Sequence, residues 1–123
     1  TRLMAFALDG SADMPPPPTV PRALPELPEL RADAAALEEG ASLYATNCYA
    51  CHGKYAAARY GSSVPDLRYA TAETHAVWHA IVIGGARRLQ GMPAFPLESG
   101  QSEAIRDYVL SRARALRVER GGN

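Results

Sequence analysis

Small and apolar residues recur at helical spacing in the first half of this chain. They lie three and four positions apart at Leu37, Gly40, Leu43 and Tyr44. This spacing is typical of one face of a helix. Asp33 precedes the pattern and is suited to an N-cap, because its carboxylate can accept hydrogen bonds from the free amides of a first turn. The pattern predicts a helix that begins near residue 33 and continues until Gly53 ends it.

Two later stretches show the same periodicity. Residues 72–83 carry an apolar stripe formed by Val77, Trp78, Ile81 and Val82. The pair Gly84-Gly85 is expected to end this second helix. A last helix is predicted from near Ser99 to about Leu116, with one face formed by Ile105, Tyr108, Val109, Arg112 and Leu116. Gly40 of the first helix is expected to let this last helix cross closely through Tyr108.

The N-terminal third has a different pattern. Residues 1–10 resemble a short strand that ends in an Asp-Gly turn, yet the chain offers it no convincing β partner. We therefore expect that partner in another chain or in a preceding part of the polypeptide. Residues 14–28 contain seven prolines and are expected to act as a spacer that reaches roughly 45 Å in a polyproline II conformation. The predicted division is a terminal strand of a missing domain (1–13), a linker (14–32), a helical domain (33–118) and a flexible tail (119–123).

Composition excludes several classes of function. The 123 residues carry 13 Lys or Arg and 13 Asp or Glu, so the formal net charge is zero. A nucleic-acid binder uses an excess of basic groups to displace counterions, so that class is excluded. The apolar runs are too short for a membrane span. The chain begins with Thr and has no leader pattern, so we expect a mature chain or an excised piece.

The chemistry of this chain is concentrated in Cys48-Tyr49-Ala50-Cys51-His52. Cys-x-x-Cys-His is the pattern of c-type haem attachment. Two thiols three positions apart on a helical turn can add to the two vinyl groups of one haem, and the adjacent His52 then ligates the iron. A haem would also complete the thin core that a domain of about 90 residues with three modest helices is expected to have.

Two other uses of these cysteines remain open at this point. Cys48, Cys51, His75 and His79 match the ligand types of a Cys₂His₂ zinc site, although the gap before His75 is long and His52 would have no role. A redox dithiol normally follows a strand within a βαβ pattern, which this sequence lacks. The spacing favours haem over both.

An electron-transfer haem also needs a sixth ligand. Met92 lies in a loop between Gly91 and Pro93, and Pro93 stiffens that loop. Met4 and Met14 lie outside the predicted domain, so Met92 is the expected axial ligand beside His52. His75 or His79 is the alternative, as in a bis-histidine site, although both are more typical of half-exposed helix positions. A peroxidase-like enzyme is disfavoured, because Met92 would fill the open iron position that such chemistry needs.

Four further residues are expected around the cofactor. The carbonyl of Pro65 is the candidate acceptor for the second ring nitrogen of His52, because a ligating histidine needs that nitrogen held. Arg68, Tyr69 and Trp78 are candidate donors to the haem propionates. The alternatives are a plain turn for Pro65, a solvated charge for Arg68 and core packing for Trp78. Arg87 and Arg88 are interpreted as solvated loop charges.

These residues together resemble class I cytochrome c over about residues 33–118. More narrowly, the chain is similar to the C-terminal cytochrome domain of quinohaemoprotein alcohol dehydrogenases. The segments that carry this resemblance are Leu43-Tyr44 to Gly53, Val64–Arg68, Trp78 with Ile81-Val82, Gly84-Gly85, Gly91–Phe95 and Tyr108–Ala113. In that family a β-propeller that holds pyrroloquinoline quinone (PQQ) precedes the cytochrome, and residues 3–10 resemble its closing strand. The resemblance implies Cys48 and Cys51 as thioether sites, His52 and Met92 as iron ligands, and Arg68 near a propionate.

The resemblance also implies a function. The expected fold is a small all-α domain around one covalent haem c, which transfers single electrons and is not an enzyme by itself. Its partners would be a preceding PQQ domain, which holds PQQ and calcium, and a redox protein or membrane acceptor in the bacterial periplasm. A free-standing soluble cytochrome shuttle is the alternative, and a structural zinc module is a further one.

Overall fold

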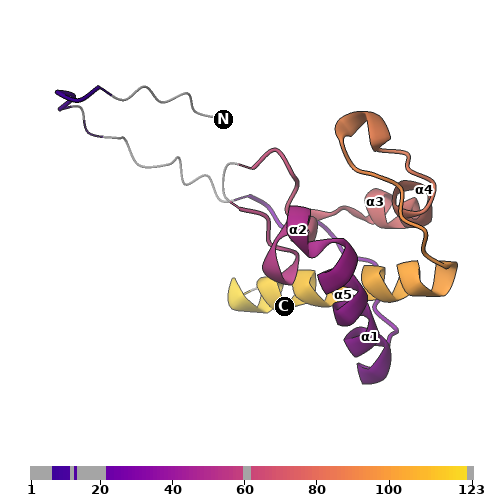
Figure 1. The fold of residues 1–123 in the computed structure, drawn as a ribbon. Helices are drawn as coiled ribbons and strands as arrows, with labels where there is room; N and C mark the ends of the chain where they lie inside the picture. Colours follow the sequence, from indigo (N-terminus) through magenta and orange to yellow (C-terminus); the bar gives the residue numbers. More distant parts are fainter. Residues whose placement is uncertain (1–6, 12, 14–21, 60–61, 122–123) are drawn as a thin grey trace.

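The computed structural model describes residues 7–11, 13, 22–59 and 62–121 (Figure 1). Regular structure within these residues is entirely helical, which confirms the predicted all-α architecture. The α-helices are α1 (Ala34–Asn47), α2 (Tyr49–His52), α3 (Ala72–Ala76), α4 (Trp78–Val82) and α5 (Ser99–Glu119). Single 3₁₀ turns cover Lys54–Ala56, Leu67–Tyr69 and Arg88–Gln90. No helix in these ranges combines the length and apolar character needed to cross a membrane.

The first helix begins where the sequence predicts. The Asp33 carboxylate accepts a hydrogen bond from the amide of Ala36 at 2.9 Å and so caps α1. The chain turns at Cys48 and continues directly into the single turn of α2. Gly53 then ends the helical path with a φ of +76°, and a Cβ at this position would lie 2.3 Å from the carbonyl oxygen of Ala57. Only glycine fits there, so the turn after His52 is determined locally.

Helices α1 and α5 cross and form the centre of the domain (Figure 1). Gly40 lies at the crossing, where a Cβ would come within 2.0 Å of the carbonyl oxygen of Ala104 and 3.0 Å of the Tyr108 side chain. One turn further along α1, the rings of Tyr44 and Tyr108 lie 5.1 Å apart between centroids. The predicted packing role of Gly40 is therefore confirmed.

The second predicted helix is divided in two. Val77 has φ −106° and ψ 20°, which separates α3 from α4. Trp78, Ile81 and Val82 are buried as predicted, but the Val77 side chain is 50% exposed. Val77 is therefore not part of the core, because the break turns it away from α5.

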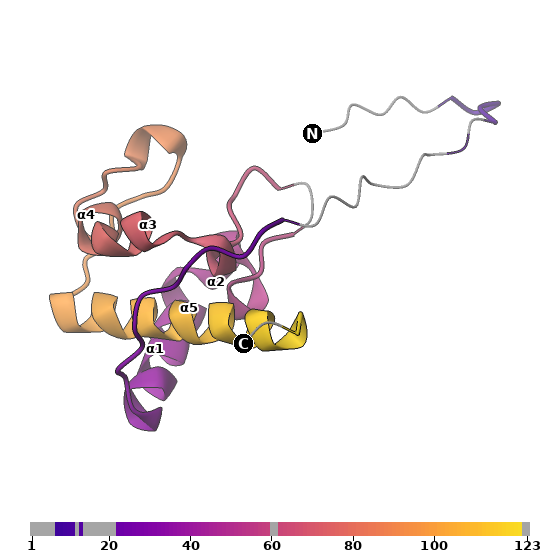
Figure 2. The same ribbon diagram turned by 180° about the vertical axis from the view of Figure 1, so that it is seen from behind.

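The segment between α4 and α5 projects from the body of the domain in both views (Figures 1 and 2). Its base is held by the amide of Phe95, which donates to the carbonyl of Val82 at 2.9 Å. Near its tip, Gly91 adopts a left-handed φ of +90°, and the amide of Met92 donates to the carbonyl of Arg87 at 3.2 Å. These bonds give the loop that carries Met92 a defined shape.

The two ends of the chain differ in part from the predictions. Most of the predicted strand, residues 1–6, lies outside the described residues, whereas the predicted Asp-Gly turn is present. In that turn the amide of Gly10 donates to the carbonyl of Ala7 at 3.1 Å. Helix α5 continues to Glu119, three residues beyond its predicted end near Leu116.

The linker is not a free spacer over its described part. Residues 22–32 form no helix or strand, and they run along α5 (Figure 2). Arg114 and Arg117 of α5 and Arg120 at its C-cap donate hydrogen bonds to backbone carbonyls of this stretch. The spacer was predicted for residues 14–28; its described part begins at residue 22, and long-range hydrogen bonds hold that part against α5.

His75 is buried, contrary to the expectation that it is half-exposed. Its side chain is stacked on Trp78, with 5.6 Å between ring centroids, and neither ring nitrogen has a hydrogen-bond partner among the described residues. Burial lowers the pKa of His75 from its ordinary 6.5 to about 4. The charge of Arg106 on α5 lowers this pKa further, and Glu103 opposes the shift.

This burial predicts a loss of stability in mild acid. The unfolded chain binds a proton at His75 near pH 6.5, whereas the folded chain binds it only near pH 4. The contribution of neutral His75 to the free energy of unfolding is therefore complete above pH 6.5 and is lost as the pH falls through 4, by about 3 kcal/mol. Denaturant unfolding of the haem-loaded protein between pH 4 and 7 measures this loss of stability. His75→Phe keeps an aromatic ring on Trp78, and equal pH dependence in both proteins would contradict the prediction.

Candidate functional site

One cavity brings the chemically active residues together. It has a volume of about 420 Å³ and lies between α2 and the projecting segment before α5. Four of its lining residues are the predicted ligands, Cys48, Cys51, His52 and Met92. Cys48, Cys51 and His52 come from one motif, whereas Met92 lies 40 residues after His52, so the fold brings Met92 to the motif.

His52 is held in one orientation. Its imidazole is buried, and its Nδ1 lies 3.0 Å from the carbonyl oxygen of Pro65. Because a carbonyl oxygen only accepts hydrogen bonds, Nδ1 must carry the proton and donate it. The neutral ring then keeps the lone pair of Nε2 free for a metal. The carbonyl of Pro65 therefore lies where it can accept this hydrogen bond.

The two cysteines lie on one turn with unequal exposure. Cys48 is 9% exposed, whereas Cys51 is open to solvent at the cavity. Burial raises the pKa of the Cys48 thiol to about 11, and the nearby Cys51 adds to this shift. Cys48 is therefore a protonated thiol at neutral pH.

Three predicted cofactor contacts are not brought to the cavity. Arg68 forms an ion pair with Asp66, in which Nη2 lies 2.7 Å from Oδ2 and Nε donates to Oδ1 at 3.0 Å. Tyr69 lies instead beneath the guanidinium of Arg22, 4.5 Å from its ring centroid. The indole N–H of Trp78 donates to the carbonyl of Ser102 at 3.0 Å, so it has no free donor for a propionate.

The cavity also contains residues that sequence reasoning missed. Arg87 lines it, although the sequence favoured a solvated loop charge. The remaining lining residues neighbour the predicted ligands along the chain: Asn47, Ser63, Val64, Gln90, Gly91, Pro93 and Phe95. Their closeness in sequence to Cys48, Pro65 or Met92 was the available signal. Arg87 lacks such a signal, because its place depends on how the projecting segment folds back.

The geometry does not favour zinc or a second histidine ligand. His79 is half-exposed, with Nε2 3.3 Å from the Glu103 carboxylate, and His75 is buried against Trp78. Neither lines the cavity that contains Cys48 and Cys51. Over the described ranges, no three His, Cys, Asp or Glu side chains are grouped closely enough to hold a metal ion.

The residues of this cavity fit a haem c. Two thiols stand one helical turn apart, an oriented imidazole offers a free nitrogen, and Met92 offers a thioether sulfur across the same space. Imidazole and thioether are the axial ligands of electron-transferring cytochromes c. Phe95 and Val64 add apolar walls, which a porphyrin ring requires.

Several known proteins are similar to this chain over most of its length. The chain is similar to the quinohemoprotein alcohol dehydrogenase ADH IIB of Pseudomonas putida, with 36% identity over 115 residues. It is also similar to ADH-IIG of the same organism, with 36% identity over 120 residues, and to the 1-butanol dehydrogenase (cytochrome c) of Thauera butanivorans, with 39% identity over 84 residues. These alignments cover 91%, 96% and 67% of this chain. The chain spans only 16%, 16% and 12% of those relatives.

A solved structure shows the same fold. The quinohemoprotein alcohol dehydrogenase ADHIIG of Pseudomonas putida HK5 superimposes with a TM-score of 0.72 at 37% sequence identity. This match covers 90% of the present chain and 16% of the other. The family model that matches, over residues 35–109, is described as cytochrome C oxidase, cbb3-type, subunit III. The all-α fold, the cavity and these matches lead to one conclusion: the chain belongs to this cytochrome c family and is a cytochrome c domain like those of quinohaemoprotein alcohol dehydrogenases.

Proposed function

We propose that this domain holds one covalent haem c and transfers single electrons through it. The observation that carries the proposal is the cavity in which Cys48, Cys51, His52 and Met92 meet, with His52 oriented by the carbonyl of Pro65. Membership of a cytochrome c family supports the same cofactor. When bound, the haem supplies a reversible one-electron change between Fe(III) and Fe(II).

The residues of the chain hold the cofactor and determine its ligand field. Cys48 and Cys51 form the thioether bonds, in which each S–H adds across one vinyl group. His52 supplies the proximal nitrogen, and its hydrogen bond to Pro65 fixes the ring and raises the basicity of the ligand. Met92 supplies the distal sulfur, which favours Fe(II) more than a second imidazole would and so raises the reduction potential.

Arg87 is our candidate for the haem carboxylates. It is the one arginine among the residues that line the cavity, whereas Arg68 is already paired with Asp66. A guanidinium matches a carboxylate in shape and charge, so Arg87 is suited to pair with a propionate. This assignment replaces the role that the sequence analysis gave to Arg68.

The larger protein is proposed from the relatives. Because this chain covers about 16% of the quinohaemoprotein alcohol dehydrogenases, we infer that a dehydrogenase domain precedes it. That domain would hold PQQ and calcium, oxidise an alcohol and pass single electrons to this domain. An external redox protein or a membrane acceptor would receive them. Covalent haem attachment and the relatives together favour the periplasm. A free-standing shuttle is the other proposal, and it needs no preceding domain.

Removing the thiols tests covalent attachment. Cys48→Ala and Cys51→Ala are each expected to keep haem by one remaining thioether, whereas the double variant releases all haem on denaturation. Cys48→Ala also loses more stability, because Cys48 is buried and Cys51 is exposed. The measurement is the mass of the denatured polypeptide. An intact protein with the mass of the bare polypeptide would overturn the proposal.

A further inference from the structure

The described half of the linker contains a three-residue repeat. Residues 24–30 have the sequence Leu-Pro-Glu-Leu-Pro-Glu-Leu. The leucines and prolines are half-buried, whereas Glu26 and Glu29 are exposed. A polyproline II helix has three residues per turn, so this repeat places the leucines along one edge and the glutamates along another. The repeat therefore gives the linker an apolar edge and a charged edge.

Helix α5 has a matching repeat. Arg114, Arg117 and Arg120 are also three positions apart, and we call them the arginine face. Each donates to a linker carbonyl that is three residues from the next: Arg114 to Pro28 at 2.9 Å, Arg117 to Pro25, and Arg120 to Arg22 at 3.0 Å. Linker and helix therefore run antiparallel in a constant register.

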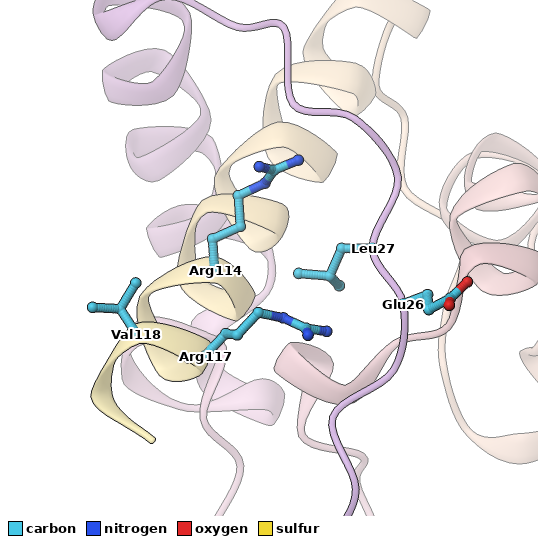
Figure 3. Close-up of a pocket in the computed structure, with 5 residues that line it drawn as sticks. All are labelled: Glu26, Leu27, Arg114, Arg117 and Val118. Carbon is cyan, nitrogen blue, oxygen red and sulfur yellow. The ribbon is translucent and has the colours of Figure 1, made fainter. Parts of the chain in front are cut away.

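The side chains between the linker and α5 also place leucine toward the helix and glutamate toward solvent. Figure 3 shows Arg114 and Arg117 reaching from α5 toward the linker, with Leu27 turned toward the helix and Glu26 turned away. These residues and Val118 line an open groove of about 480 Å³. The backbone carbonyls of a polyproline II segment have no internal partners, so a row of arginines is suited to bind them.

The upstream end of the contact is also anchored. The guanidinium of Arg22 lies 4.5 Å from the ring centroid of Tyr69, and that of Arg120 lies 5.5 Å from the same ring. Tyr69 is four residues beyond Pro65, whose carbonyl accepts the hydrogen bond from His52. The linker therefore reaches the domain on the side of the cavity that holds His52.

We propose that the arginine face is a recognition surface for a polyproline II segment with this three-residue repeat, and that its occupant is the chain's own residues 22–30. Docking then determines where the upstream chain leaves the domain, which is at Tyr69 on the His52 side. Under the function proposed above, on which this step rests, the preceding domain is held on that side. The Met92 side, where Leu89 is fully exposed, stays open to the external acceptor.

Insertions into the linker test the register without altering α5. One serine inserted between Glu26 and Leu27 rotates the upstream residues by one third of a polyproline II turn, so that Leu24 leaves the edge that faces α5 and Glu26 takes the place of Pro25. A Leu-Pro-Glu insertion at the same point adds one full repeat and restores the register. A glutamate-specific protease, used on the native haem-loaded protein, cuts after Glu26 and Glu29 only when the linker opens. The cleavage rate therefore measures docking.

The register predicts different rates for the two insertions. The single-serine insertion is expected to raise the rate of cleavage about tenfold, because Leu24 leaves the half-buried edge of the linker and Glu26 is turned toward α5. The three-residue insertion should stay within about twofold of the natural protein, because it returns leucines and prolines to that edge. Equal rates for the two insertions, or a natural protein that is cut as fast as the serine variant, would overturn the proposal.

Variants of the arginine face test the α5 side of the same contact. Arg114→Gln with Arg117→Gln should raise the same cleavage rate about tenfold. Arg59→Gln with Arg88→Gln removes the same charge from exposed positions that make no side-chain hydrogen bond or ion pair with the described linker residues, and should leave the rate unchanged. Equal rates in the two double variants would overturn the proposal. The result is independent of the proposed function, whose failure would appear as a protein without covalent haem.

Discussion

Met92→Ala is expected to open the iron of the haem-loaded protein to external ligands. Without the thioether sulfur, no second methionine and no histidine besides His52 lines the cavity among the described residues. Carbon monoxide should then bind the reduced variant quickly, and cyanide should bind the oxidised one. The reduction potential should fall by on the order of 100 mV, because a thioether ligand favours Fe(II) and axial ligands control the potential.

Leu89→Ala is the matched control for this variant. Leu89 lies in the same projecting segment and is fully exposed, so its loss should leave ligand binding and potential unchanged. Stopped-flow mixing and a redox titration measure the two effects. If the intact protein already binds carbon monoxide as fast as the variant, Met92 is not the sixth ligand.

Gly40→Ala is expected to destabilise the domain by about 3 kcal/mol or more. The new methyl group would lie 2.0 Å from the carbonyl oxygen of Ala104, which belongs to the backbone of α5 and has no flexible end to move. Helices α1 and α5 must therefore separate, which also disturbs the contact between Tyr44 and Tyr108. The intrinsic helix preference of alanine, about 1 kcal/mol, offsets only part of this loss.

Gly100→Ala makes the same chemical change without the clash. Gly100 lies in the first turn of α5, is exposed and has no neighbour within 4 Å of an added Cβ. This control should be neutral or stabilise the domain by up to about 1 kcal/mol. Denaturant unfolding followed by circular dichroism measures both variants. Equal stability of the two would show that the helices do not approach as closely as the structure places them.

Local patterns predicted much of this domain. The N-cap at Asp33, the end at Gly53 and the close crossing at Gly40 all depend on a residue type whose physical requirement is visible in the sequence. The orienting carbonyl of Pro65 was also predicted, because a haem-ligating histidine needs an acceptor and the turn after the motif supplies one.

The features that the sequence did not predict depend on which of several possible partners a side chain contacts in the folded domain. Arg68 was a reasonable donor to a propionate, but Asp66, two residues before it, binds the guanidinium first. The indole of Trp78 finds the carbonyl of Ser102, which lies 24 residues away. The break at Val77 contains no glycine or proline and so gave no signal.

The docking of the linker on α5 also could not be predicted from local sequence. Its contacts with α5 join residues 86 to 98 positions apart, so no local pattern predicts them. The three-residue spacing of the leucines and of the arginines was present in the sequence. Neither repeat predicts the contact by itself. The contact can be recognised only once the fold places the linker beside α5.

The visible and near-infrared spectrum of the purified protein, oxidised and then reduced, tests whether this cavity holds haem between His52 and Met92. Denaturation beforehand shows whether the haem is covalent. We predict a red protein that keeps its haem when denatured and shows the weak charge-transfer band of methionine bound to Fe(III). Haem without that band would remove Met92 from the site, and a colourless protein that contains zinc would contradict the whole account.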